Sequence, residues 1–251
     1  MYLKNGDNLS MTMNTKEFDE TIVYKGQGAE ENNFMVQKAL KDEQFELIAF
    51  DKETEEFNKM FEAKKTADFE SLEKGKLDET FKATVKKMMT QQFSGMQRMY
   101  TENLLIKKLN GNPSPSFAYE NHKGGVTKLE EFKGKYVYID VWATWCAPCR
   151  AEIPFLKKIE EKYHGKNIEF VSISIDTKKD YDKWKKFVTD KNLGGVQLFA
   201  DNDWNSQFVK DFGISGIPRF ILIDPKGNVL NANADRPSSE ELDKVLSELV
   251  K

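Results

Sequence analysis

The sequence is poor in metal-binding side chains and lacks a hydrophobic run that could cross a membrane. Its 251 residues include two cysteines and two histidines. A closed structural zinc site needs four ligands, and beyond the cysteine pair the chain offers only His122 and His164, so no metal site is predicted. No stretch of about 18 apolar residues occurs, and residues 1–6 do not resemble a secretion signal. The chain as given is therefore expected to carry neither a transmembrane segment nor a signal peptide.

The sequence also lacks any concentration of charge of one sign. Its formal net charge of −3 comes from 38 basic and 41 acidic residues, which are spread along the whole length. This distribution creates no strong local field for nucleic acid or an anionic membrane, so no nucleic-acid partner is expected. With 39% hydrophobic and 12% aromatic residues, the chain can build the core of a soluble protein with one large or two ordinary domains.

Residues 1–112 are predicted to form a mostly helical N-terminal accessory domain with short strands at 9–13 and 21–24. Apolar residues spaced three and four apart indicate one face of a long helix, and we interpret this methionine-containing stripe as helix packing, without a ligand. A turn-forming segment with two prolines, 110–116, opposes helix and sets the domain boundary near residue 112. The stripe consists of Phe81, Val85, Met88, Met89, Phe93, Met96, Met99, Tyr100 and Leu104.

Residues 113–251 alternate between strand and helix patterns, which predicts an α/β domain with a mainly parallel sheet flanked by helices. The turn signal at 224–228 indicates that the last two strands form a hairpin. A closing helix is expected at 238–249, with Ser238 or Ser239 as its cap. The buried strands are predicted at 136–141, 168–175, 196–199 and 220–223, and the helices at about 149–163, 180–190 and 204–212.

Both cysteines lie in the motif Cys146-Ala147-Pro148-Cys149, directly after a buried strand. A helix beginning near Cys146 would stabilise its thiolate through free backbone amides and the helix dipole. Cys149, one turn later, should be more buried and able to close a disulfide. Such a pair exchanges disulfides in either direction. A purely structural disulfide across so short a loop would stabilise the fold little, so a catalytic pair is favoured.

Two carboxylic acids near the motif are candidates for proton transfer. Asp140 lies inside the buried strand, where an unpaired acid should have a raised pKa and could accept the proton of Cys149. The alternative is that Asp140 points outward to polar neighbours. Glu152 follows Cys149 by about one helical turn, so it is either a second acid or base near the thiols or a surface residue without a role.

The stretch at 141–150, with Gly216-Ile217-Pro218 about 70 residues later, resembles the thioredoxin superfamily. Within that superfamily the match is to the TlpA/ResA-like, AhpC/TSA-related group of bacterial thiol-disulfide oxidoreductases, and it covers residues 113–251. Position alone favours an ordinary trans Pro218, whereas the resemblance implies a cis proline that faces the cysteines. The implied fold is thioredoxin-like, with a mixed, mainly parallel sheet.

The resemblance also assigns roles to individual residues. Cys146 would be the exposed nucleophile and Cys149 the resolving thiol. The backbone beside Ile217 would hold an extended substrate segment by strand-like hydrogen bonds. The remaining assignments are Asp140 as the buried acid, Glu152 as an active-site glutamate, Trp145 as a shield of the thiol, and Trp145, Ala147, Pro148, Ile217 and Pro218 as the substrate-binding surface.

The function implied is a thiol-disulfide oxidoreductase that reduces disulfides of exported proteins and needs no cofactor beyond the redox-active pair Cys146–Cys149. Its partners would be protein thiols or disulfides and a membrane-bound or exported electron donor, in the periplasm, with a lipoprotein tether as one form. A peroxidase is the nearest alternative, but its P-x-x-x-T-x-x-C motif fails at either cysteine. A binding module on a thioredoxin scaffold is the other, and the intact C-x-x-C argues against it.

Overall fold

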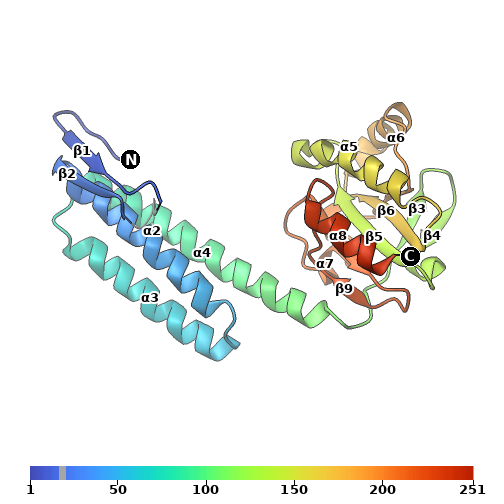
Figure 1. Cartoon of the computed structure of the whole chain (residues 1–251), viewed down its shortest axis with the longest axis horizontal. Coiled ribbons are helices and arrows are strands. Elements are labelled where there is room, and N and C mark those ends of the chain that lie inside the picture. Colours follow the sequence, from blue (N-terminus) through green and yellow to red (C-terminus); the bar gives the residue numbers. More distant parts are fainter. Residues whose placement is uncertain (17–20, 251) are drawn as a thin grey trace. The chain divides into compact units, whose positions relative to one another are not determined.

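The computed structural model describes residues 1–16 and 21–250 and divides the chain into two compact units, Met1–Thr101 and Glu102–Lys251. Figure 1 shows both units, coloured along the sequence. The unit border falls inside helix α4 (Glu79–Leu109), and the boundary predicted near residue 112 lies just after that helix. Lys251, the last residue of the predicted second domain, lies outside the described residues.

Unit 1 contains a two-stranded antiparallel sheet followed by long helices. Strands β1 (Asn8–Thr12) and β2 (Val23–Gln27) pair with each other. Helices α2 (Ala29–Ala49) and α3 (Thr54–Lys74) precede α4. The Phe57 and Tyr100 rings stack with their centroids 3.5 Å apart, which joins α3 to α4 through buried aromatic surface.

Six residues of the predicted apolar stripe are buried in α4, and for two residues the prediction is wrong. Met88 and Met99 are 49% and 48% exposed. Each directly precedes a buried residue, and because an α-helix turns by 100° per residue, two adjacent side chains cannot both face the same neighbouring helix. Leu104 is partly buried. The buried members are Phe81, Val85, Met89, Phe93, Met96 and Tyr100.

A network of ionised side chains lies between the helices of unit 1. Lys38 Nζ is 2.6 Å from Asp42 Oδ2, and Lys64 Nζ is 2.6 Å from Asp42 Oδ1 and 2.7 Å from Asp68 Oδ2. These four side chains are only 7–11% exposed. Burial alone would raise the pKa of Asp42, but Lys38 and Lys64 outweigh it and hold that pKa below its ordinary value. Asp42 is therefore ionised inside the unit.

Unit 2 is built on a seven-stranded mixed sheet in the order β4-β3-β7-β6-β5-β8-β9. Among the described strands, two of six neighbouring pairs are parallel, β5 with β6 and β6 with β7; the others are antiparallel. The sheet is therefore mixed, but it is not the mainly parallel sheet that was expected. Two of the antiparallel pairs, β3–β4 and β8–β9, are hairpins that need no crossover helix, and the other two, β3–β7 and β5–β8, join strands distant in the sequence. The strands are β3 (Ala118–Asn121), β4 (Val126–Lys128), β5 (Tyr136–Trp142), β6 (Ile168–Ser174), β7 (Val196–Phe199), β8 (Arg219–Ile223) and β9 (Val229–Asn231).

Helices cover both faces of this sheet, as predicted. On one face Tyr138 and Phe220 of the sheet pack in a cluster with Leu156 and Leu246, from α5 and α8. The cluster on the other face includes Trp184 of α6. The helices are α5 (Ala147–Lys162), α6 (Tyr181–Asp190), α7 (Gln207–Asp211) and α8 (Glu240–Leu249), with short 3-10 turns η1 (Leu129–Phe132), η2 (Lys178–Asp180) and η3 (Asp203–Asn205).

Local signals in the sequence are also recovered in unit 2. The turn after β8 leads into an antiparallel hairpin with β9. Of the two candidate caps of α8, Ser239 is the one whose hydroxyl accepts a hydrogen bond from the Glu241 backbone N–H, at 3.1 Å. Within the described residues, no helix is both long enough and apolar enough to cross a membrane.

We predict that Asp42→Asn lowers the free energy of unfolding by about 3–5 kcal/mol, because it leaves the buried Lys38 without a counter-charge and Lys64 with Asp68 alone. The measurement is urea unfolding of the full chain, followed by circular dichroism. The control is Glu70→Gln, which removes an exposed ion pair with Lys74 and should change stability by less than about 1 kcal/mol. Equal effects of the two substitutions would contradict the prediction.

Candidate active site

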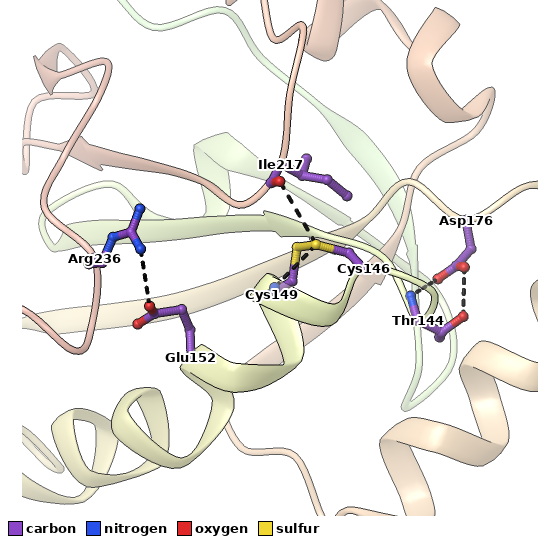
Figure 2. Close-up of a disulfide and its surroundings, with 7 residues drawn as sticks. All are labelled: Thr144, Cys146, Cys149, Glu152, Asp176, Ile217 and Arg236. Carbon is purple, nitrogen blue, oxygen red and sulfur yellow. Dashed lines mark hydrogen bonds and ion pairs between the residues drawn. A yellow bond between two sulfur atoms is a disulfide. The ribbon is translucent and has the colours of Figure 1, made fainter. Parts of the chain in front are cut away.

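The two cysteines form a disulfide at the start of helix α5, just beyond the carboxyl end of β5 (Figure 2). Cys146 is the N-cap residue of α5, as predicted, and the Cys149 backbone N–H donates a hydrogen bond to its Sγ at 3.1 Å. The Cα atoms of the pair are 5.3 Å apart. In the reduced protein the same amide and the helix dipole favour a thiolate on Cys146.

The sulfur atoms themselves are covered, and their neighbours form the exposed surface. Cys146 is 5% and Cys149 is 3% exposed, so the exposed nucleophile that the resemblance implied is buried in this disulfide form. Trp145 is 49% exposed, and Ala147 and Pro148 are also exposed. These three side chains therefore form the exposed surface beside the buried sulfur atoms.

The loop before β8 lies over the disulfide. The Ile217–Pro218 peptide bond is cis, which confirms the isomer that the resemblance implied. The Ile217 carbonyl oxygen is 3.9 Å from Cys146 Sγ (Figure 2). Within the described residues the Ile217 backbone N–H donates no hydrogen bond. The backbone at Ile217 thus offers a free N–H beside the sulfur that would react.

Asp140 is buried in the middle of β5, which rules out the alternative that it points outward to polar neighbours. It is 7% exposed, and no hydrogen bond to its carboxyl group occurs among the described residues. Burial, followed by the nearby carboxylates of Glu152 and Glu160, raises its pKa to about 8. At neutral pH the Asp140 carboxyl group of the oxidised protein therefore carries a proton.

Glu152 is not a surface residue, because it is 8% exposed and joins α5 to the segment before α8. Its carboxylate accepts hydrogen bonds from the Ser238 backbone N–H and hydroxyl, both at 2.9 Å. Arg236 Nη1 lies 3.7 Å from its Oε1 (Figure 2). With three donors around it, the Glu152 carboxylate is held in place on the helix that carries both cysteines.

A third buried acid, Asp176, was not predicted from the sequence. The Thr144 backbone N–H and hydroxyl donate to its two oxygens at 2.8 and 2.7 Å (Figure 2), and the Ser174 hydroxyl donates at 2.8 Å. Asp176 thereby fixes the loop that leads from β5 to Cys146. The available signal was a polar pair, Ser174 and Asp176, at the end of a segment otherwise read as a buried strand.

Glu160 was also missed, although it follows Cys149 by eleven residues along α5 and so lies about three helical turns away on a related face. Burial raises its pKa to about 7, against the opposing charge of Lys157. In the described part of the chain, no group of three or more His, Cys, Asp or Glu side chains is placed to hold a metal ion. The reactive and polar groups described at this site are thus the two cysteines, the carboxyl groups of the buried acids and the unpaired backbone N–H of Ile217.

Comparisons with known proteins match the unit that carries this site. The profile of the Redoxin family matches residues 109–246. The thiol-disulfide oxidoreductase ResA of Bacillus thuringiensis subsp. konkukian is 29% identical over 140 residues, which span 55% of this chain and 78% of the relative. ResA of Bacillus subtilis is 27% identical over 122 residues, 48% of this chain and 64% of the relative.

Two crystal structures from Bacteroides vulgatus are similar over the same part of the chain. One is a protein proposed to be a thiol-disulfide oxidoreductase, with 37% identity, a TM-score of 0.51, and coverage of 56% of this chain and 96% of that structure. The other is the thioredoxin domain of a thiol-disulfide oxidoreductase, with 27% identity, a TM-score of 0.51, and coverage of 57% and 98%. These neighbours confirm the thioredoxin-like fold predicted from the motif.

We predict that Asp140→Asn stabilises the oxidised protein by an amount that grows with pH. Between about pH 4 and 8 the unfolded chain has released the Asp140 proton while the native state retains it, because the native pKa is about 8. Wild-type stability therefore falls as pH rises through this window, by at most about 1.4 kcal/mol per pH unit from this group. The variant has no carboxyl group at this position and so lacks this pH dependence. The test is to measure the unfolding free energies of both proteins across this pH range, and parallel pH profiles would contradict the prediction.

Proposed function

Because the chain belongs to the Redoxin family, we propose that its Cys146–Cys149 pair reduces disulfide bonds in exported proteins. Thiol-disulfide oxidoreductase activity itself follows from the named relatives and from the C-x-x-C pair at a helix start. The direction and the substrate are the proposed part. The observation that carries the proposal is the Cys146 sulfur, bonded to Cys149 and lying 3.9 Å from the Ile217 carbonyl oxygen beside a free Ile217 N–H.

The first step is attack by the Cys146 thiolate on one sulfur of a substrate disulfide. A bond forms between Cys146 Sγ and that sulfur, the substrate S–S bond breaks, and the second substrate sulfur leaves as a thiolate. The Cys149 N–H and the amino end of α5 stabilise the attacking negative charge. The product of this step is a mixed disulfide between enzyme and substrate.

The second step resolves the mixed disulfide. Cys149 loses its proton and attacks Cys146 Sγ, and the remaining substrate sulfur leaves, so that the substrate has gained two electrons and, from solvent and enzyme, two protons. We assign Asp140, in its ionised form, as the acceptor of the Cys149 proton, which it releases to solvent before the next turnover. The raised pKa of Asp140 in the disulfide form, about 8, suits a group that holds a proton once the disulfide has closed.

Substrate binding is assigned to the exposed surface around the sulfur. An extended substrate segment can pair with the backbone of Ile217 as an added strand. Trp145, Ala147 and Pro148 provide apolar contact on the other side of Cys146. Because backbone pairing does not depend on side chains, this mode supports a protein substrate class that is broad in sequence.

The cellular setting is proposed from the resemblance to TlpA/ResA-like proteins and from redox chemistry. Disulfides persist mainly outside the cytoplasm, which is where a reductase of exported proteins would act. Each turnover leaves Cys146–Cys149 oxidised, so an electron donor must return two electrons. We propose a membrane-bound or exported thiol donor and a periplasmic location for this unit.

The reductase direction predicts a reduction potential near or below about −220 mV for the Cys146–Cys149 couple. Equilibration in glutathione buffers, with alkylation and mass analysis of the free thiols, measures it. A potential near about −120 mV would instead make the protein an oxidant that installs disulfides. That result would overturn the proposed direction while leaving thiol-disulfide exchange intact.

The order of attack predicts that Cys149→Ser accumulates mixed disulfides, because the resolving sulfur is missing. Cys146→Ser should trap none and should lose disulfide reduction. Purified variants are incubated with insulin, separated on non-reducing gels and identified by mass spectrometry. Trapping by Cys146→Ser in place of Cys149→Ser would reverse the assigned roles, and trapping by neither would argue against protein substrates.

A further inference from the structure

The last eight residues of helix α4, 102–109, lie against the loop that carries the cis proline. We call these segments the α4 end and the cis-proline loop, residues 213–218; both belong to unit 2. The Ser215 hydroxyl donates a hydrogen bond to Glu102 Oε1. This bond joins a helix residue to the loop two positions before Ile217.

Packing holds the loop to the helix on its other side. Gly213 has a φ of +59°, and the Leu105 Cδ2 atom lies 2.4 Å from where a Cβ on Gly213 would be. The positive φ favours glycine at this position, and the Leu105 side chain packs directly against it. Ile106 and Leu109 pack against the core cluster that includes Ile214. The α4 end is thus seated on the base of the cis-proline loop.

Glu102 also acts on the residue after the cis peptide. Burial lowers the pKa of the Arg219 guanidinium, and the negative charge of Glu102 opposes that shift. The two groups are therefore close enough to interact electrostatically. Glu102 thus accepts a hydrogen bond from Ser215 and interacts electrostatically with Arg219. These two residues lie on the two sides of the Ile217–Pro218 bond.

The tip of the loop has little support of its own. Ser215 and Gly216 are exposed, and a Cβ on Gly216 would meet no atom within 4 Å. In the described part of the chain, the backbone N–H groups of Ser215, Gly216 and Ile217 donate no hydrogen bonds. The Ser215–Glu102 bond is accordingly a main restraint on the segment that leads to Ile217.

We propose that Glu102 is a positioning residue, which holds the cis-proline loop beside Cys146 in the shape that binds an extended substrate. This inference rests on the proposed function and extends it to a residue outside the Redoxin match, which begins at 109. A loop held in its bound conformation loses less conformational entropy when substrate binds. The α4 end therefore contributes to substrate affinity without touching the substrate.

The test is single-turnover oxidation of the pre-reduced full chain by insulin, followed by tryptophan fluorescence. Glu102→Ala and Ser215→Ala should each raise the half-saturating insulin concentration roughly three- to tenfold, with no further rise in the double variant. The maximal rate, the reduction potential and the rate with bis(2-hydroxyethyl) disulfide should stay unchanged, because that small molecule has no backbone to pair with the loop.

Matched variants separate positioning from general stability. Glu102→Gln keeps an oxygen that accepts from Ser215 and should stay within about twofold of wild type. Lys108→Ala, an exposed site on the same helix end, should have no effect. Hydrogen exchange gives a readout independent of activity: Gly213 and Ile214, whose amides bond to Lys210 and Val209, should exchange faster in Glu102→Ala.

Two results would overturn the inference. Unchanged insulin saturation with unchanged exchange of the loop amides would mean that Glu102 does not hold the loop. An equal loss with insulin and the small disulfide, or a shifted reduction potential, would mean that it acts on the cysteines. If the wild-type protein fails to oxidise its dithiol with insulin at all, the proposed function fails, and the exchange measurement alone still decides whether Glu102 restrains the loop.

Discussion

The surroundings of the Cys146 sulfur depend on where helix α5 begins. Cys146 caps α5, and the amide of Cys149 points at its sulfur from 3.1 Å. The start of that helix is fixed from both ends of the preceding loop: Trp142 ends a buried strand, and Thr144 is bonded twice to the fully buried Asp176. A shift of this loop would move the sulfur away from the amide that stabilises its charge. Thr144 and Asp176 therefore help to set the position of the Cys146 sulfur.

The other side of the site is built differently, because in the proposed binding mode its contacts with substrate are made by backbone atoms. A backbone that must pair with substrate cannot already be paired within the protein. The Ile217 segment accordingly lacks the ladder bonds that hold a strand in place. Its order has to come from neighbours, and the α4 end supplies them through Glu102 and Leu105. A backbone segment left unpaired for substrate therefore needs contacts from another element to keep its shape.

The sequence was sufficient for the features that local patterns encode. Periodicity located the central strands and helices, and the cysteine motif placed the helix start at Cys146. The thioredoxin-like fold and the cis Pro218 came from the family resemblance of residues 141–150 and 216–218, since position alone favoured a trans proline. The short strands β3 and β4 were missed, since three or four residues show too little alternation. The Glu152–Ser238 and Glu102–Ser215 contacts join residues 86 and 113 positions apart. No local pattern carries such pairs, because they form only when the fold brings separate segments together.

Two buried aspartates illustrate how the chain separates structure from chemistry. Asp42 has two lysines within 2.6 Å and stays ionised, with a lowered pKa. Asp140 has no partner among the described residues and becomes neutral, with a pKa of about 8. Both cost free energy to bury, but only a carboxyl group left unpaired can gain and lose a proton near neutral pH. Pairing Asp140 with a lysine would lower its pKa and keep the carboxyl group ionised at neutral pH, as it does for Asp42. Leaving Asp140 unpaired is therefore what the proton-acceptor role proposed above requires.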